Sequence, residues 1–456
     1  MARLKDFVFQ QFLNQRPICV MARTALERML NASHLDELFL THATVQYTRE
    51  LLFSQLIEVM ARVVTRVNSS VFGACTALKD VLTVSDEAVY QKLRGVEPHV
   101  SQAVVRRSFT ETEGVLKELG ALHDSWVPGL RVKILDGNHL ASTEHRLQEL
   151  RSIWEAPLPG VSLVVWDQPT RAIRDVFLSE NGHAQERSLL GQLIDTILEN
   201  DLWIADRNFC TLALMFGIRA RKAWFIIRQH GQVKGRLAGE RRLVGKTRDG
   251  QPVYEQTLIL IHEGVEKKFR RITIGLATPT RDGDTEIHLL TNLKSQVKGA
   301  RVGELYRQRW TIEAVFNELT VALKCEVNTL CYPKAALFAF CVAVTLENTL
   351  SLMKGAIRAV HGLEAAAELS GYRMAAELEA SYDGMMVALP PSKWTIFAKM
   401  TVKEFACMLK QMAEHVDPAA YRVRRRGPKK QAEKRTRTAK GIHVSTAKIL
   451  LMRHTT

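Results

Sequence analysis

The segment Arg131-Val-Lys-Ile-Leu-Asp136-Gly137 has the composition of a buried strand that ends in an acidic residue. A second segment of the same kind, Asp201-Leu-Trp-Ile-Ala-Asp206-Arg207, follows 70 residues later. A carboxylate at the end of a buried strand projects from a rigid support. Both segments therefore predict acidic groups at the edge of a sheet.

A third carboxylate, Glu313, lies in the stretch Tyr306-Arg-Gln-Arg-Trp-Thr-Ile-Glu313, which has helical spacing. Two strand-end aspartates and a helical glutamate supply the oxygen ligands that hard divalent cations prefer. Two such cations can stabilise both the attacking and the leaving oxygen of a phosphodiester. The three residues Asp136, Asp206 and Glu313 thus indicate a metal site suited to cutting nucleic acid.

The segments around the two aspartates predict an α/β domain. Strands are expected at 130–135, 160–166 and 172–178, joined by short turns typical of an antiparallel meander. A helix over 184–199, a strand over 202–205, a helix over 212–221 and a strand over 223–227 complete the pattern. From 229 to 294 the chain alternates β-favouring runs with turn signals, and one long helix is expected over 302–323.

These motifs resemble the DDE transposases of bacterial insertion sequences, in particular the insertion sequence four family. The segments that carry the resemblance are Asp136-Gly137, Ile204-Ala-Asp206-Arg-Asn-Phe209 and Tyr306-x-x-Arg309-Trp-x-Ile-Glu313. The resemblance implies a ribonuclease H-like mixed sheet core with a β-strand insertion. In that fold the first and fourth strands are neighbours, so Asp136 and Asp206 would meet.

The resemblance also implies roles for the site residues. Asp136 and Asp206 would share one Mg²⁺ or Mn²⁺ ion, and Asp136 and Glu313 would bind a second. Tyr306 and Arg309 would contact the phosphate beside the cut. The family signature places a lysine seven residues after the glutamate, where this chain has Thr320, which suggests weaker anchoring of the DNA backbone.

A lysine does lie close to this position, at Lys324. On one continuous helix at ~100° per residue, Lys324 would share a face with Tyr306, about 16 Å along the axis from Glu313. It would then contact the DNA backbone at a distance from the metals.

Several neighbouring residues admit two interpretations. Arg207 would contact a phosphate or pair with a core carboxylate. Asn138 and His139 would support the metal ligands, although a polar loop residue is the favoured interpretation of His139. His183 and Glu186 would cap the following helix, which is favoured, or approach the site. Trp166, Trp224 and Trp310 are core candidates, and one aromatic could instead stack on an unpaired base.

The net charge of +15 is concentrated at one end. Residues 417–456 contain 12 Lys and Arg but 2 Asp and Glu, which favours a polyanionic partner for this tail. Its segment Arg424-Arg425-Arg426-Gly-Pro-Lys429-Lys430 resembles a minor-groove hook, and a nonspecific charge run is the alternative. Either form would bind DNA phosphates.

The remaining composition is that of an ordinary globular protein, with 46% hydrophobic and 24% charged residues. Seven scattered cysteines without a CxxC pair fit a reducing cytoplasm and argue against structural zinc.

The N-terminus lacks the apolar core of a signal peptide. The longest apolar run, 335–344, is shorter than the ~20 residues of a membrane span, so we expect a buried helix and no membrane partner.

These observations predict five regions. They are a helical DNA-binding domain (1–128) with a helix-turn-helix-like unit capped by Ser85, a catalytic core (129–228 and 295–330), a β insertion (229–294), a helical region (331–416) and a basic tail (417–456). For 1–128 a helical packing domain is the alternative.

The expected activity is cut-and-paste transposition in the bacterial cytoplasm. The enzyme would act as a homodimer on double-stranded DNA, both at terminal inverted repeats and at target DNA. The alternatives are a nuclease that does not join DNA and a domesticated, non-catalytic DNA-binding protein.

Overall fold

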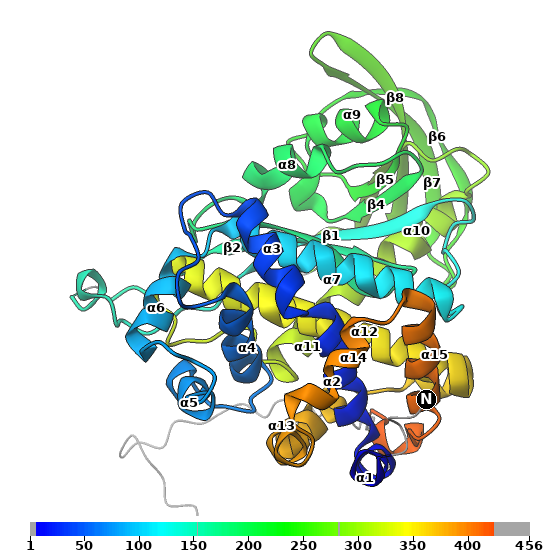
Figure 1. Cartoon of the computed structure of the whole chain (residues 1–456). Helices are drawn as coiled ribbons and strands as arrows, with labels where there is room; N and C mark the ends of the chain where they lie inside the picture. Colours follow the sequence, from blue (N-terminus) through cyan, green and yellow to red (C-terminus); the bar gives the residue numbers. More distant parts are fainter. Residues whose placement is uncertain (1–5, 153, 281–282, 424–456) are drawn as a thin grey trace, which may run out of the picture. The chain divides into compact units, whose positions relative to one another are not determined.

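The computed structural model describes residues 6–152, 154–280 and 283–423 of the chain. One compact unit, Met1–Arg422, contains the elements described below. The strands are β1 (Arg131–His139), β2 (Val161–Asp167), β3 (Ala172–Ser179), β4 (Asp201–Ala205), β5 (Trp224–Arg228), β6 (Arg236–Lys246), β7 (Pro252–His262), β8 (Val265–Gly275) and β9 (Glu286–Thr291). Figure 1 shows these strands as one sheet with helices on both of its faces.

The nine strands form a mixed sheet in the order β3-β2-β1-β4-β5-β9-β8-β7-β6. β1, β4 and β5 are parallel neighbours, whereas β2 and β3 pair antiparallel. This is the ribonuclease H-like arrangement expected from the sequence, with the first and fourth strands side by side. The predicted β insertion is confirmed, and β9 joins it to the core sheet by pairing with β5.

Alternation of apolar residues along the strands produces two hydrophobic layers. On one face, Val132, Ile134 and Ile204 join the larger core, which also contains the long helix α12 (Pro333–Ala367). On the other face, Leu135, Trp203 and Ala205 pack with residues of the short helices α8 (Leu190–Ile194) and α9 (Leu212–Ala220). The strands around the two aspartates are therefore fixed from both sides, which makes their ends rigid supports.

The helices before the sheet confirm a helical N-terminal region. They are α1 (Phe7–Gln15), α2 (Pro17–Met29), α3 (Ala32–His42), α4 (Phe53–Val64), α5 (Val71–Ala77), α6 (Asp86–Gly95) and α7 (Pro98–Glu118). Ser85 caps α6, as predicted, by accepting a hydrogen bond from the Ala88 amide. The basic side chains Arg94, Arg106 and Arg107 each pair with a carboxylate of the same chain, at Glu87, Asp175 and Glu111 respectively. DNA binding by this region stays a prediction.

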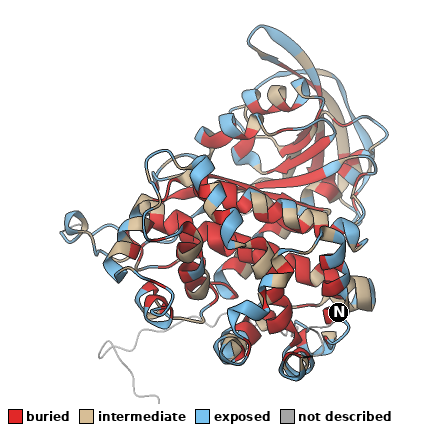
Figure 2. Ribbon diagram, viewed as in Figure 1, coloured by how far each residue is buried: buried red, intermediate tan, exposed pale blue. Residues whose placement is uncertain are grey.

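The remaining helices lie between and after the strands. They are α8 (Leu190–Ile194), α9 (Leu212–Ala220), α10 (Gly299–Arg307), α11 (Thr311–Val321), α12 (Pro333–Ala367), α13 (Gly371–Ala388), α14 (Thr395–Ala398) and α15 (Val402–Ala413). By length and composition, α12 is the one described helix that could cross a bilayer, but its most apolar window is completely buried inside the protein. Figure 2 shows α12 running through the centre of the helical part, in agreement with the predicted buried helix at 335–344.

Two predicted helices differ in the structure. The helix expected over 184–199 is a short 3-10 turn, η3 (Glu186–Leu189), followed by α8, which ends at Ile194. The chain leaves the helix because the Leu198 amide donates to the Asp201 carboxylate instead of to a helical carbonyl. The apolar spacing is satisfied nonetheless, because Leu190, Leu193 and Ile197 are buried.

The helix expected over 302–323 consists of α10, a 3-10 turn η5 (Gln308–Trp310) and α11, and it ends at Val321. The Lys324 amide donates to the Val64 carbonyl outside the helix, and its ammonium donates to the Ser69 carbonyl at 2.9 Å. The predicted helical position of Lys324, on one face with Tyr306, is therefore wrong. Lys324 is instead held by these hydrogen bonds to the N-terminal region.

The folded unit also extends beyond the predicted start of the tail at 417. Tyr421 is buried, and its hydroxyl donates to the Glu377 carboxylate. The tail residues Arg424, Arg425, Arg426, Lys429 and Lys430 lie outside the described residues.

Candidate active site

The two aspartates occupy matching positions on neighbouring parallel strands. Asp206 directly follows β4, but the predicted end of the first strand at 135 is wrong: residues 136–139 pair with β2, so β1 continues to His139 and Asp136 lies inside it. Leu135 of β1 pairs with Ala205 of β4, so the next residue on each strand is Asp136 and Asp206. Parallel strands present their carboxyl ends at the same edge of a sheet, which brings the two acids together there. The adjacency expected from the fold is therefore present.

Glu313 is joined to this edge by an arginine from its own helix segment. Arg309 donates through Nη1 to Asp136 Oδ2 at 2.7 Å and through Nη2 to Glu313 Oε1 at 3.2 Å. Residues four apart on a helix lie on one face, so the second contact follows from the local geometry. The first contact spans 173 residues and ties the segment that joins α10 and α11 to β1.

The pKa values of this cluster reflect its crowding. Burial raises the pKa of Asp136 to about 6, Arg309 opposes this shift, and the charges of Asp206 and Glu186 add to it. Burial also opposes the charge of Arg309, but the neighbouring Asp136 and other acidic groups raise its pKa overall. The arrangement concentrates negative charge and holds one guanidinium between the carboxylates.

A fourth carboxylate, Glu186, belongs to the same cluster. Its Oε2 accepts a hydrogen bond from Asn208 Nδ2 at 2.6 Å, and its Oε1 lies 3.6 Å from His139 Nε2. It does not cap the following helical turn, because the capping position is Gln185, whose side chain makes no capping bond. The prediction that Glu186 is a cap is therefore wrong, and it approaches the site instead.

The carboxylate of Glu186 also lies against Gly137. A side chain at Gly137 would meet this carboxylate, so Glu186 would have to move to make room for it. The other expected cap, His183, is exposed, and its amide donates to the Asn181 side chain.

Three other residues predicted to contact DNA differ in their exposure. Tyr306 is partly buried beside Arg309, and burial raises the pKa of its hydroxyl. Arg207 is exposed in the turn directly after Asp206. Thr320 is exposed on α11, where its hydroxyl donates to the Phe316 carbonyl at 2.9 Å. DNA contacts by these residues stay predictions.

The three tryptophans that were assigned to the core differ in how far they are buried. Trp166 is buried in the core as predicted, and Trp224 is partly buried. Trp310 is 61% exposed, so its assignment to the core is wrong. It lies directly after Arg309, whose guanidinium is 5.4 Å from its ring centre. An exposed aromatic side chain therefore borders the acidic cluster.

The donor chemistry of the cluster fits a hard divalent cation, because its carboxylate oxygens are the ligands that such ions prefer. Within the described residues, however, no three acidic, histidine or cysteine side chains are positioned to hold a metal. The Arg309 guanidinium forms ion pairs with both Asp136 and Glu313.

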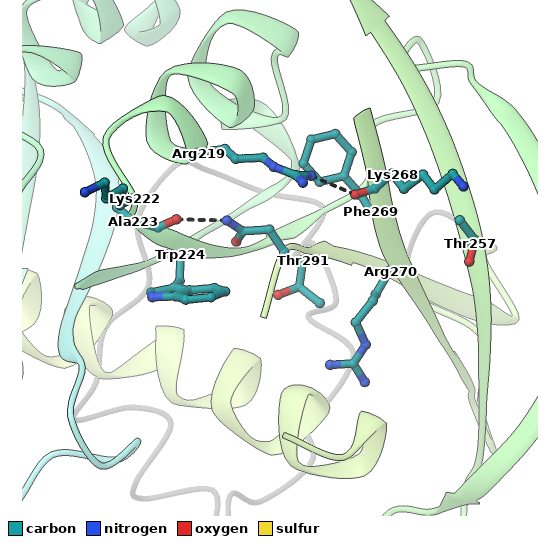
Figure 3. Close-up of a pocket in the computed structure, with 10 residues that line it drawn as sticks. Arg219, Lys222, Ala223, Trp224, Thr257, Lys268, Phe269, Arg270 and Thr291 are labelled. Carbon is teal, nitrogen blue, oxygen red and sulfur yellow. Dashed lines mark hydrogen bonds between the residues drawn. The ribbon is translucent and has the colours of Figure 1, made fainter. Parts of the chain in front are cut away.

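A basic pocket of about 390 Å³ lies at the opposite edge of the sheet, where β5 begins (Figure 3). Arg219, Lys222 and Lys268 line it together with Trp224. Two of its polar groups are already bonded within the protein, since Arg219 donates to the Lys268 carbonyl and Asn292 donates to the Ala223 carbonyl. This pocket is separate from the carboxylates, which lie at the other end of β4.

Comparison with known proteins finds a match to a family over most of the residues described above. Residues 159–343 match the profile of the family described as "Transposase DDE domain", a range that includes Asp206, Glu313 and the β insertion and begins after Asp136. A curated protein of Sinorhizobium fredii, "Putative transposase y4zB", is 29% identical over 126 residues. This alignment covers 27% of the chain and about a third (34%) of the length of that relative.

Among solved structures, the piggyBac transposase synaptic complex with hairpin DNA aligns with a TM-score of 0.42 at 10% identity. That alignment covers 93% of this chain and 89% of the other. The family match therefore indicates similarity to the transposase DDE domain over the part of the chain that carries Asp206 and Glu313.

Proposed function

We propose that this chain is a DNA transposase that cuts phosphodiester bonds at the ends of its own element and joins the freed 3′ ends to target DNA. The observation that carries the proposal is the convergence of Asp136, Asp206 and Glu313 around Arg309. The match of residues 159–343 to the transposase DDE profile supports the same conclusion.

Asp136 and Asp206 would hold one Mg²⁺ or Mn²⁺ ion, and Asp136 and Glu313 a second. When bound, such a pair lowers the pKa of a water molecule and stabilises the departing 3′ oxygen. Arg309 must release Asp136 Oδ2 when this carboxylate binds metal. Its guanidinium would then be available, beside the site, for bidentate bonds to a DNA phosphate.

The proposed partner is double-stranded DNA, both at the terminal inverted repeats and at the target, with the chain acting as a homodimer on paired ends in the cytoplasm. The basic residues 424–456 would add electrostatic affinity. Each phosphate neutralised steepens the salt dependence of binding by roughly 0.9 log units per log unit of salt.

The test is a cleavage and joining assay with Mg²⁺ or Mn²⁺, using DNA that carries the repeats flanking the gene. The proposal expects nicked and excised products, and strand-transfer products from a pre-cut end. Glu313→Gln should give neither. Cleavage without joining would support the alternative nuclease, and DNA binding without cleavage would support a domesticated DNA-binding protein.

The role of the tail is tested by ending the chain after Val423, which keeps the buried Tyr421 in place. The shortened protein should bind DNA more weakly, and the loss should be larger at low salt than at high salt. An unchanged slope of affinity against salt would contradict phosphate contacts by the tail.

A further inference from the structure

A cavity of about 530 Å³ lies behind α11, on the side bounded by α12 and the turn between β2 and β3. Its charged or titratable lining residues are His123, Arg171, Glu318, Glu347, Lys354 and Arg358. Thr311 and Ala314 of α11 also line it, so one helix separates this cavity from the cluster that contains Glu313.

Arg171, which lines this cavity, has an unusual backbone conformation. Its φ of 58° lies in the left-handed region, which costs a non-glycine residue roughly 1 kcal/mol. Its carbonyl accepts a hydrogen bond from the Ser351 hydroxyl at 2.9 Å. Its guanidinium lies 5.7 Å from the ring centre of Trp126 and 5.4 Å from that of Trp166, while its Nε is buried without a hydrogen-bond partner.

Arg358 lines the same cavity as Arg171. In the part of the chain that the structure describes, neither guanidinium forms an ion pair with a carboxylate; Arg358 contacts His123 instead. Burial lowers the pKa of Arg171, and the charge of Arg358 lowers it further. Burial and the two arginines lower the pKa of His123 to about 4, so this imidazole is neutral near pH 7.

The acidic groups of the cavity do not balance these two charges. Glu318 is bound to the Lys354 ammonium at 2.6 Å. Glu347 is 2% exposed, and burial raises the pKa of its carboxyl group well above the usual range, which favours the neutral acid. Its Oε2 is buried and has no hydrogen-bond partner, so it can serve a bound ligand.

We propose that Arg171 and Arg358 bind a phosphate-type oxyanion in this cavity. Guanidinium groups form paired, charge-assisted hydrogen bonds to phosphate oxygens, and such a ligand would relieve the repulsion between two partly buried cations. The unpartnered Nε of Arg171 and the carboxyl group of Glu347 would supply further contacts. This site is distinct from the carboxylate cluster and does not depend on the proposed transposase activity.

The test is binding of inorganic phosphate and pyrophosphate to the full chain, measured by titration calorimetry at constant ionic strength. Arg171→Gln and Arg358→Gln should each weaken binding about tenfold or more. Arg151→Gln removes an exposed arginine elsewhere and should leave the affinity unchanged. Equal affinity in the wild-type and all three variants, or no binding by the wild-type, would overturn the proposal.

Stability in the absence of phosphate distinguishes a binding role from a structural one. Removal of one of two repelling cations should leave the Tm of Arg358→Gln equal to or above that of the wild-type, and Arg358→Lys should keep part of the affinity. A large fall in Tm together with unchanged phosphate affinity in Arg358→Lys and Arg358→Gln would contradict the proposal.

The source of the phosphate is decided by competition. A short DNA duplex that displaces labelled pyrophosphate would assign the site to a backbone phosphate of DNA. Undiminished pyrophosphate binding in the presence of saturating duplex would assign it to a free phosphate compound.

Discussion

The paired stretch of β1 and β4 has an ion cluster at each end, and the two clusters differ in how completely their charges are paired. At the amino end of β4, Asp201 accepts hydrogen bonds from Lys133 Nζ at 2.7 Å, Arg131 Nε at 3.0 Å and the Leu198 amide at 2.9 Å. Asp201 and Lys133 are fully buried there. At the carboxyl end, Asp136, Asp206, Glu313 and Glu186 gather near Arg309.

The two clusters on the same strands therefore differ in how far their charges are already paired. Asp201 accepts hydrogen bonds from three donors, so its charge is already paired and a ligand would add no further stabilisation. At the other end the acidic groups outnumber the arginine that contacts Asp136 and Glu313, and burial disfavours the charge of Asp136. Unsatisfied charge in an accessible position is typical of a site that binds an ion or a substrate.

The largest expected effect separates activity from stability. Asp136→Asn and Asp206→Asn should each lower metal-dependent DNA cleavage by about 10⁴-fold or more, because a neutral amide is a poor ligand for a hard cation. DNA binding and Tm should stay close to those of the wild-type. Cleavage of labelled DNA and thermal unfolding measure the two properties, and wild-type cleavage by either variant would remove that residue from the site.

The opposite result is expected at the other end of the strands. Asp201→Asn should lower the free energy of unfolding by about 3–5 kcal/mol, because the buried Lys133 ammonium loses its counter-charge. Denaturant unfolding measures this loss. The double variant Lys133→Met, Asp201→Asn should recover part of it, and no recovery would show that the Lys133 charge is not the cause.

A smaller effect is expected from pH on the metal-free protein. The pKa of Asp136 is about 6 when folded and near its ordinary value when unfolded, so folding favours the neutral acid. The stability contributed by the acid is fully present below pH ~4 and is lost as the pH rises through about 6.

The wild-type should therefore lose about 2 kcal/mol relative to Asp136→Asn between these pH values. Unfolding at a series of pH values measures it, with the exposed Asp124→Asn as the control. A constant difference between wild-type and Asp136→Asn would contradict the raised pKa.

The smallest effect concerns competition for the carboxylates. Arg309→Gln should bind Mn²⁺ about fivefold more tightly than the wild-type, because no guanidinium has to leave Asp136 and Glu313. The Mn²⁺-dependent rise in Tm measures the affinity. An unchanged affinity would show that Arg309 does not oppose metal binding.

Much of the core could be predicted because its strands are short apolar runs, and the acids that follow these runs are visible in the sequence. The end of β1 was placed too early, because the pairing of residues 136–139 with β2 depends on the tertiary structure. The helix over 184–199 was overestimated because 3-10 turns bury the same apolar residues, while Asp201 binds the Leu198 amide. The role of Glu186 could not be predicted, because its contacts with His139 and Asn208 join segments that are distant in the chain. The sequence likewise gives no sign that Glu186 approaches Gly137, because these two residues also come together only in the folded chain.

The sequence by itself determined the succession of strands and helices, the β-rich stretch over 229–294 and the identity of three acidic residues, because hydrophobic periodicity and turn signals are local properties. The expected adjacency of the first and fourth strands came from the resemblance to a known fold. Only the tertiary structure decided how their charges are balanced. Arg309 reaches Asp136 across 173 residues, and Lys324 turns away to the Ser69 carbonyl. Arg171 and Arg358 line one cavity, and neither forms an ion pair with a carboxylate of the described residues. Burial and pairing of charges depend on which segments pack together, and that is a property of the whole fold.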